Sequence, residues 1–167
     1  MKEVAKAWHD HPEMKQAIAM TEEKANAADR HGSWLYCATY FNDAETVDKL
    51  LALKADVNKQ LYNPDFSHAR SVMIAAACMK DIEIMDKLVQ AGGDINGKLD
   101  NGMTPLFAAV LNTDPKMVKY LLAHTADPNA AIAGINVNCL HQAASLDSKE
   151  IAVTAFDRWK SRCECRA

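Results

Sequence analysis

Apolar residues recur along the chain at the three- and four-residue spacing of an amphipathic helix, in short blocks separated by polar turns. In the block 115–123, Met117, Val118, Leu121 and Leu122 fall on one helical face. A shorter block of small and apolar residues, PLFAAV, directly follows Thr104. Thr and Asp are favoured at helix N-caps, and proline is tolerated at the first helical position. The pattern therefore predicts a short helix after Thr104, a tight turn, and a longer helix after the Asp114 cap.

The same unit recurs four times in one register, with copies beginning 38, 33 and 34 residues apart. Each copy opens with a cap residue and has a second cap residue ten positions later: Ser33, Ser71, Thr104 and Asn138, then Asp43, Asp81, Asp114 and Ser148. The second position past each first cap is Leu or Met, and the fifth is alanine in every copy: Ala38, Ala76, Ala109 and Ala143. One helix pair cannot bury its apolar face alone, so the copies are expected to stack. An alanine in every copy indicates short helices that pass too close for a larger side chain.

This period, the stretch NGMTPLFAAV and three Asp-x-Asn endings (Asn58, Asn96 and Asn129) resemble the ankyrin repeat. In the fourth copy, His141 also matches the histidine of the family motif. The resemblance implies an all-α solenoid of helix-turn-helix repeats with short β-turn or hairpin connections. We predict one domain over residues 1–167, with an N-terminal capping unit at 1–32 and a C-terminal capping repeat at 134–167. Between them lie repeats at 33–66, 67–99 and 100–133. Excision from a longer protein is the alternative.

Two departures from the family pattern carry information. Where a glycine usually ends the second helix in a left-handed conformation, this chain has Gly92 once but Lys54 and Thr125 in the other copies. We expect the same backbone there, at a cost of about 1 kcal/mol each relative to glycine. The second departure is an insertion of five residues after Asn58, within KQLYNPDFSHAR.

Composition excludes several classes of protein. The formal net charge of −3 and the pI near 6.0 give no reason to expect nucleic acid, and no apolar run could span a bilayer. The first residues lack the apolar core of a signal peptide. The five cysteines show no disulfide-framework spacing, so we expect a reducing compartment: the cytoplasm, or the host cytosol for a secreted effector.

We find no sequence signal for catalysis, a metal site or a cofactor. Cys139 with His141, the CxC pair Cys163 and Cys165, and the HDH at 9–11 are weak metal signals, and ordinary structural roles are favoured. No glycine-rich phosphate loop and no nucleophile elbow occurs. An enzyme or metal-binding protein that uses these cysteines and histidines stays as the alternative.

With no signal for catalysis, we expect the function to lie in binding through the surface of the stack. The resemblance implies that the chain binds protein partners with a concave surface formed by the turn tips and the short helices. Seven and eight positions past the first caps stand large apolar residues at places we expect to face solvent: Tyr40, Phe41, Met79, Leu111 and Leu146. We expect a rim of turn-tip residues, overhung by the inserted Tyr62 and Phe66: Arg30, His31, His68, Arg70, Asp100, Asn101 and Met103. The alternative is that the N-terminal unit or a neighbouring helix covers Tyr40 and Phe41.

The sequence thus predicts a monomeric protein-binding module with no cofactor, no nucleic acid and no membrane among its partners. Two uses compete: a bacterial or viral effector or immunity-type protein, and a regulatory part of a larger protein. The identity of the protein partner is not encoded in these motifs.

Overall fold

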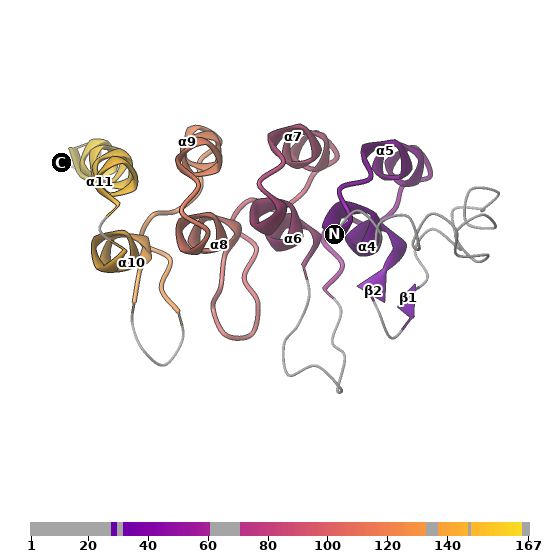
Figure 1. The fold of residues 1–167 in the computed structure, drawn as a ribbon, viewed down its shortest axis with the longest axis horizontal. Coiled ribbons are helices and arrows are strands. Elements are labelled where there is room, and N and C mark those ends of the chain that lie inside the picture. The colour runs from indigo at the N-terminus through magenta and orange to yellow at the C-terminus, as the bar shows by residue number, and fades with distance from the viewer. Residues whose placement is uncertain (1–27, 30–31, 61–70, 133–136, 147, 165–167) are drawn as a thin grey trace.

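A computed structural model describes residues 28–29, 32–60, 71–132, 137–146 and 148–164. Within these residues the chain forms eight helices in four helix-turn-helix pairs (Figure 1). The short first helices are α4 (Trp34–Tyr40), α6 (Val72–Met79), α8 (Pro105–Leu111) and α10 (Cys139–Ser145). The second helices are α5 (Ala44–Ala52), α7 (Ile82–Gln90), α9 (Pro115–Ala123) and α11 (Lys149–Glu164). The predicted all-α repeat solenoid is confirmed.

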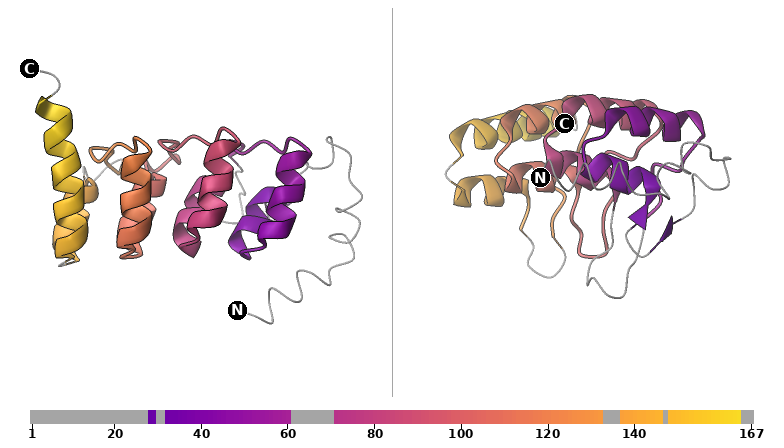
Figure 2. Two further views of the ribbon diagram at one scale, coloured as in Figure 1. Left: turned by 90° about the horizontal axis from the view of Figure 1, so that it is seen from above. Right: turned by 45° about the vertical axis from the view of Figure 1, so that its right-hand side comes forward.

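The helices form two layers. Figure 1 shows α4, α6, α8 and α10 in one row and α5, α7, α9 and α11 in a second row above it. Each short helix packs against the next short helix and against its own partner. The loop between α7 and α8 projects away from the second row, as Figure 1 and the right view of Figure 2 agree. The strands found among the described residues are β1 (Ala28–Asp29) and β2 (Gly32–Ser33), which pair antiparallel.

The predicted caps begin the helices. The Thr104 Oγ1 accepts a hydrogen bond from the Phe107 N–H at 3.2 Å, and Ser33 and Asn138 cap their helices in the same way. The second caps also accept backbone N–H groups through their carboxylates: Asp43, Asp81 and Asp114. Ser71 differs, because its side chain makes no capping hydrogen bond although its backbone is extended like that of the other caps.

The alanine column is fully buried. Ala38, Ala76, Ala109 and Ala143 are all 0 % exposed, as expected for adjacent short helices that meet at these positions. The leucine or methionine three residues earlier is buried in the first three repeats: Leu35, Met73 and Leu106. Leu140 is only half-buried, because no further helix pair follows α10 and α11 among the described residues.

Asparagine side chains join consecutive repeats. The Asn58 side chain donates to the Gly92 carbonyl at 2.9 Å and accepts from the Asp94 N–H at 2.7 Å. The same two bonds occur one repeat later, from Asn96 to Thr125 and Asp127 at 3.3 and 2.8 Å. Each asparagine bridge satisfies backbone groups that the helix end leaves unpaired. The Asp-x-Asn endings at Asn58 and Asn96 are therefore links between repeats.

Helices α5, α7 and α9 are each followed by a left-handed residue, as predicted. Lys54, Gly92 and Thr125 have φ values of 54°, 88° and 69°. The Lys54 N–H bonds to the Leu51 carbonyl at 2.9 Å and the Ala55 N–H bonds to the Leu50 carbonyl at 3.0 Å, the two bonds of a Schellman motif. The tight turns within the first three pairs also use positive φ, at Asn42, Lys80 and Thr113, which the sequence did not indicate.

Replacing Lys54 or Thr125 by glycine is expected to raise the free energy of unfolding by up to about 1 kcal/mol, because glycine adopts this backbone without strain. Thr125 carries the greater strain, since a β-branched residue is a true outlier at positive φ. Urea unfolding of each variant would measure the effect.

Gly92→Ala is the matched control. A Cβ at Gly92 would meet nothing within 4 Å, so its loss of stability would report backbone strain alone. Destabilisation by both glycine substitutions would contradict the strain argument.

Thr39 carries a buried hydroxyl without a partner. Its side chain is 0 % exposed, and within the described part of the chain its Oγ1 makes no hydrogen bond. The equivalent positions of the next two repeats hold Ala77 and Val110.

Thr39→Val is expected to raise the free energy of unfolding by about 1 kcal/mol, because it removes an unsatisfied buried polar group and nearly preserves volume. Thr46→Val is the control: the Thr46 hydroxyl donates to the Asp43 carboxylate at 2.6 Å, so this substitution should destabilise. Thermal unfolding of the two variants would test the contrast. A loss of stability in Thr39→Val would contradict the argument that the Thr39 hydroxyl is unsatisfied.

Candidate functional site

The predicted apolar residues lie at the carboxyl ends of the short helices. Tyr40, Met79 and Leu111 are the last residues of α4, α6 and α8. Phe41 and Leu146 are the C-caps of α4 and α10. Because these four helices lie side by side in one row (Figure 1), the repeat brings their ends to one edge of the stack. We call Tyr40, Phe41, Met79, Leu111 and Leu146 the apolar row.

Three members of the apolar row face solvent. The exposed fractions are 47 % for Tyr40, 42 % for Leu111 and 38 % for Leu146. Phe41 and Met79 are half-buried, so the expectation of solvent exposure holds only in part for these two. Tyr40 is the most exposed of the five, and the N-terminal unit that could have covered it lies mostly outside the described residues.

Aromatic rings gather at one end of the row. The Tyr36 and Tyr40 rings stack with centroids 6.0 Å apart, and the Phe41 ring meets Tyr40 edge-on at 5.4 Å. Tyr36 was missed in the sequence, although its spacing of four residues from Tyr40 places both on one helical face. Aromatic side chains lose little conformational freedom when they bind, so this cluster is suited to anchoring a partner.

A side-chain contact links the row between two repeats. Cys78, which precedes Met79, is hydrogen-bonded to Asn112 in the next repeat. Burial raises the pKa of the Cys78 thiol, and this bond lowers it by a smaller amount. The thiol is therefore neutral near pH 7 and acts as a small, weakly polar part of the surface.

The loop between α7 and α8 forms the part of the predicted rim that the structure describes. The Leu99 N–H bonds to the Met103 carbonyl at 3.0 Å, and Gly102 turns the chain with a φ of 82°. Asp100 is exposed, and Asn101 and Met103 are half-buried.

This loop leads into the amino end of α8, whereas Leu111 is at the carboxyl end. A helix of seven residues is roughly 10 Å long, so the two ends lie about that far apart. The loop therefore borders the short-helix face at the end opposite the apolar row. The other predicted rim and overhanging residues lie outside the described residues: Arg30, His31, Tyr62, Phe66, His68 and Arg70.

The cysteine and histidine of the fourth repeat do not converge. Cys139 is fully buried, and burial raises the pKa of its thiol to about 12. His141 is exposed on another face of α10. Across the residues that the structure describes, no three His, Cys, Asp or Glu side chains are grouped to hold a metal ion. A thiolate at Cys139 is thus disfavoured at neutral pH.

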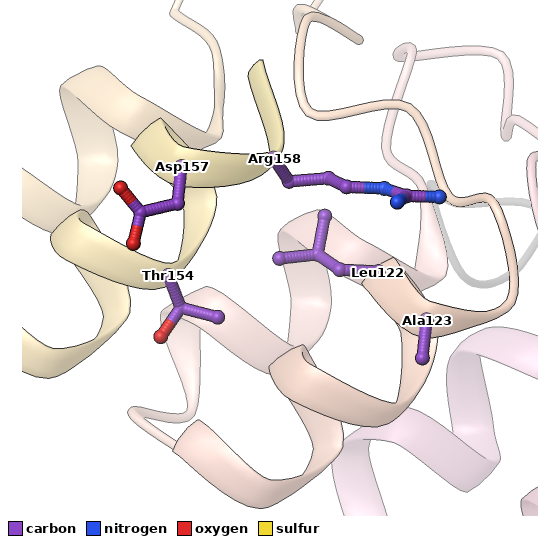
Figure 3. A pocket seen from close by; sticks show the side chains of 5 residues that line it. All are labelled: Leu122, Ala123, Thr154, Asp157 and Arg158. Carbon is purple, nitrogen blue, oxygen red and sulfur yellow. The ribbon is translucent and has the colours of Figure 1, made fainter. Parts of the chain in front are cut away.

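A shallow hollow of about 290 Å³ lies between α9 and α11 (Figure 3). Its lining residues are Leu122, Ala123, Thr154, Asp157 and Arg158. Figure 3 shows Arg158 extending past Leu122, with Thr154 and Asp157 on the α11 side of the hollow. The hollow belongs to the second layer, so it is separate from the apolar row.

Comparison with known proteins gives a family. A family model of ankyrin repeats matches residues 62–156 in three copies, which is more than half of the chain. The match spans α6 to α9 and most of the last pair, and the structure has one further helix pair, α4 and α5, before it. A search of curated proteins finds no match. No helix among the described residues combines the length and the apolar character that a membrane crossing requires.

Proposed function

Because the chain belongs to the ankyrin repeat family, whose repeats are protein–protein interaction modules, we propose that it binds a partner protein through the apolar row. The observation that carries this proposal is the solvent exposure of Tyr40, Leu111 and Leu146, which lie seven or eight positions past the cap in three repeats. Apolar side chains that gather on the surface of a folded protein usually mark an interface.

The character of the row supports a protein ligand. Its members carry no charge, and interface cores are depleted of charged residues and enriched in the Tyr, Phe and Met that make up three of its five side chains. Exposed polar residues of the tight turns stand next to it: Asn42, Lys80 and Thr113. A polar border around an apolar centre is the usual anatomy of such an interface.

The row also supports binding rather than catalysis. It consists of a tyrosine, a phenylalanine, a methionine and two leucines, and it holds no carboxylate, imidazole or amine of the kind that usually transfers protons in catalysis. The Cys78 thiol, next to Met79 in the chain, has a raised pKa, which disfavours its use as a nucleophile.

A comparative pull-down tests the proposal. The full chain and its Leu111→Ser variant serve as baits, and captured proteins are identified by mass spectrometry. The partner is expected to be captured by the wild type and lost with the variant. Lys119→Ser, an exposed change on the second layer, is the matched control and should retain it. A partner that Leu111→Ser retains and Lys119→Ser loses would contradict the assignment of the apolar row.

The identity of the captured protein also decides between the two proposed uses of the module. A foreign or host protein would support an effector or immunity-type role. A protein of the same pathway would support a regulatory role as part of a larger protein.

A further inference from the structure

Two asparagines of this chain are followed by glycine: Asn96 and Asn101. In an Asn-Gly sequence the backbone nitrogen of the glycine can attack the amide carbon of the asparagine side chain, because glycine has no Cβ to hinder the approach. A bond forms between that nitrogen and Cγ, the nitrogen loses its proton, and ammonia leaves as the Cγ–Nδ2 bond breaks. Water then opens the cyclic imide to give aspartate or isoaspartate.

The two sites have similar backbone hydrogen bonds. The Gly97 N–H donates to the Asp94 carbonyl at 3.1 Å, and the Gly102 N–H donates to the Leu99 carbonyl at 2.8 Å. Each glycine is therefore the last residue of a tight turn, and the nitrogen that would attack has the same kind of partner at both sites. A difference in reactivity must then come from the asparagine side chains.

The side chain of Asn96 is bonded to the next repeat, whereas that of Asn101 is bonded within its own loop. The Asn96 Nδ2 donates to the Thr125 carbonyl, and its Oδ1 accepts from the Asp127 N–H. The Asn101 Oδ1 accepts from the Met103 N–H at 3.0 Å. Because deamidation expels Nδ2, it cannot proceed at Asn96 while both bonds of the bridge are kept. The reaction there therefore requires the third repeat to move away from the second.

Neither product of the reaction can rebuild the bridge. An aspartate at position 96 has two acceptor oxygens, so one of them would face the Thr125 carbonyl with no proton between them. The Asp94 carboxylate accepts the Asn96 N–H at 2.9 Å, so the new negative charge would also arise beside an existing one. Isoaspartate brings the side-chain methylene into the backbone and so displaces the bonding group. In both cases the Thr125 carbonyl loses its donor, which costs stability.

We propose that Asn96 is a modification site, deamidated with water as the co-reactant, and that stacking of the second and third repeats controls the reaction. While these repeats are stacked, the bridge protects Asn96. When they separate, Asn96 deamidates, and the repeats then stack less stably because the bridge does not form again. The junction therefore weakens irreversibly as the molecule ages. The equivalent bridge residue Asn58 precedes Lys59 and lacks the reactive glycine.

Peptide mapping of the full chain after incubation at mildly alkaline pH tests the proposal. Trypsin cleaves after Lys59 and Lys98, so three asparagines fall in separate peptides for mass spectrometry: Asn58, Asn96 and Asn101. In the folded chain we expect Asn101 to deamidate at least about tenfold faster than Asn96, which reacts only from the open junction. In concentrated urea the two should react at similar rates, because both precede glycine. Asn58 should be the slowest in both conditions.

A destabilised variant tests the control by stacking. Ala109→Leu, in α8 of the third repeat, is expected to speed deamidation of Asn96 about fivefold or more and to leave the rate at Asn101 unchanged. Urea below the unfolding midpoint should have the same selective effect on the wild type, which keeps the test valid if the variant fails to fold.

The product is tested by substitution. Asn96→Asp is expected to lower the urea midpoint of unfolding, as is Asn58→Asp at the equivalent bridge. Asn101→Asp makes the same chemical change outside any bridge, so it is the matched control and should leave the midpoint unchanged.

Equal deamidation rates of Asn96 and Asn101 in the folded chain would overturn the proposal, because the bridge would then give no protection. So would a rate at Asn96 that subdenaturing urea leaves unchanged. An Asn96→Asp variant as stable as the wild type would overturn it as well, because the reaction would then leave the junction intact.

Discussion

Replacing Tyr40 or Leu111 by alanine is expected to weaken binding of the partner protein by about 2 kcal/mol, a rise in Kd of about thirtyfold. These two residues are the most exposed members of the apolar row, so truncation removes contact area without opening the core. Phe41→Ala and Met79→Ala are expected to weaken binding as well. Because both side chains are half-buried, part of their effect would come from local packing.

Calorimetric titration of the partner identified by pull-down would measure these differences. Lys119→Ala and Glu150→Ala, exposed on the second layer, should change the binding free energy by less than about 0.5 kcal/mol. Circular dichroism controls for folding. Binding that depends on Lys119 and Glu150, and is indifferent to Tyr40 and Leu111, would place the interface on the other layer.

Replacing Ala76 or Ala109 by leucine is expected to lower the free energy of unfolding by about 1–3 kcal/mol. Both alanines are 0 % exposed, in helices that have a neighbouring short helix on each side. The extra methyl groups would have to force the helices apart or take strained rotamers, because the interior has no room for them.

Urea unfolding with Ala52→Leu as the matched control would measure the cost. Ala52 is exposed at the end of α5, so the same substitution there should be neutral within about 0.5 kcal/mol. If the variants at Ala76 and Ala109 were as stable as the wild type, close packing of the short helices would not be what excludes larger residues.

Features that recur in every repeat were predictable from the sequence. The caps and the alanine column each depend on local geometry that the repeats share, so the four copies reinforce one another. The left-handed ends at Lys54 and Thr125 were also predictable, because Gly92 marks the position in one copy. The left-handed turns at Asn42, Lys80 and Thr113 were not, since no copy has a glycine there.

The candidate site was predictable only in part. Its register followed from the repeats, but the burial of each side chain depends on neighbours that differ from copy to copy. Phe41 is half-buried and packs edge-on against Tyr40, a contact specific to the first repeat. The exposure of Val153 and Phe156 on α11 was not predictable for a different reason. These residues continue the helical pattern of a core face, and only the structure shows that they are exposed.

The asparagine bridges make the repeats interchangeable along the chain. Each bridge is made to a backbone carbonyl and a backbone N–H, so it depends on the backbone conformation of the next helix end and not on its side chains. In-frame excision of residues 71–103 would bring Asn58 opposite the Thr125 carbonyl and the Asp127 N–H, the same pair of groups that Asn96 now engages. Recombination could therefore shorten or lengthen such a stack by whole repeats while the asparagine hydrogen bonds at the new junction are retained.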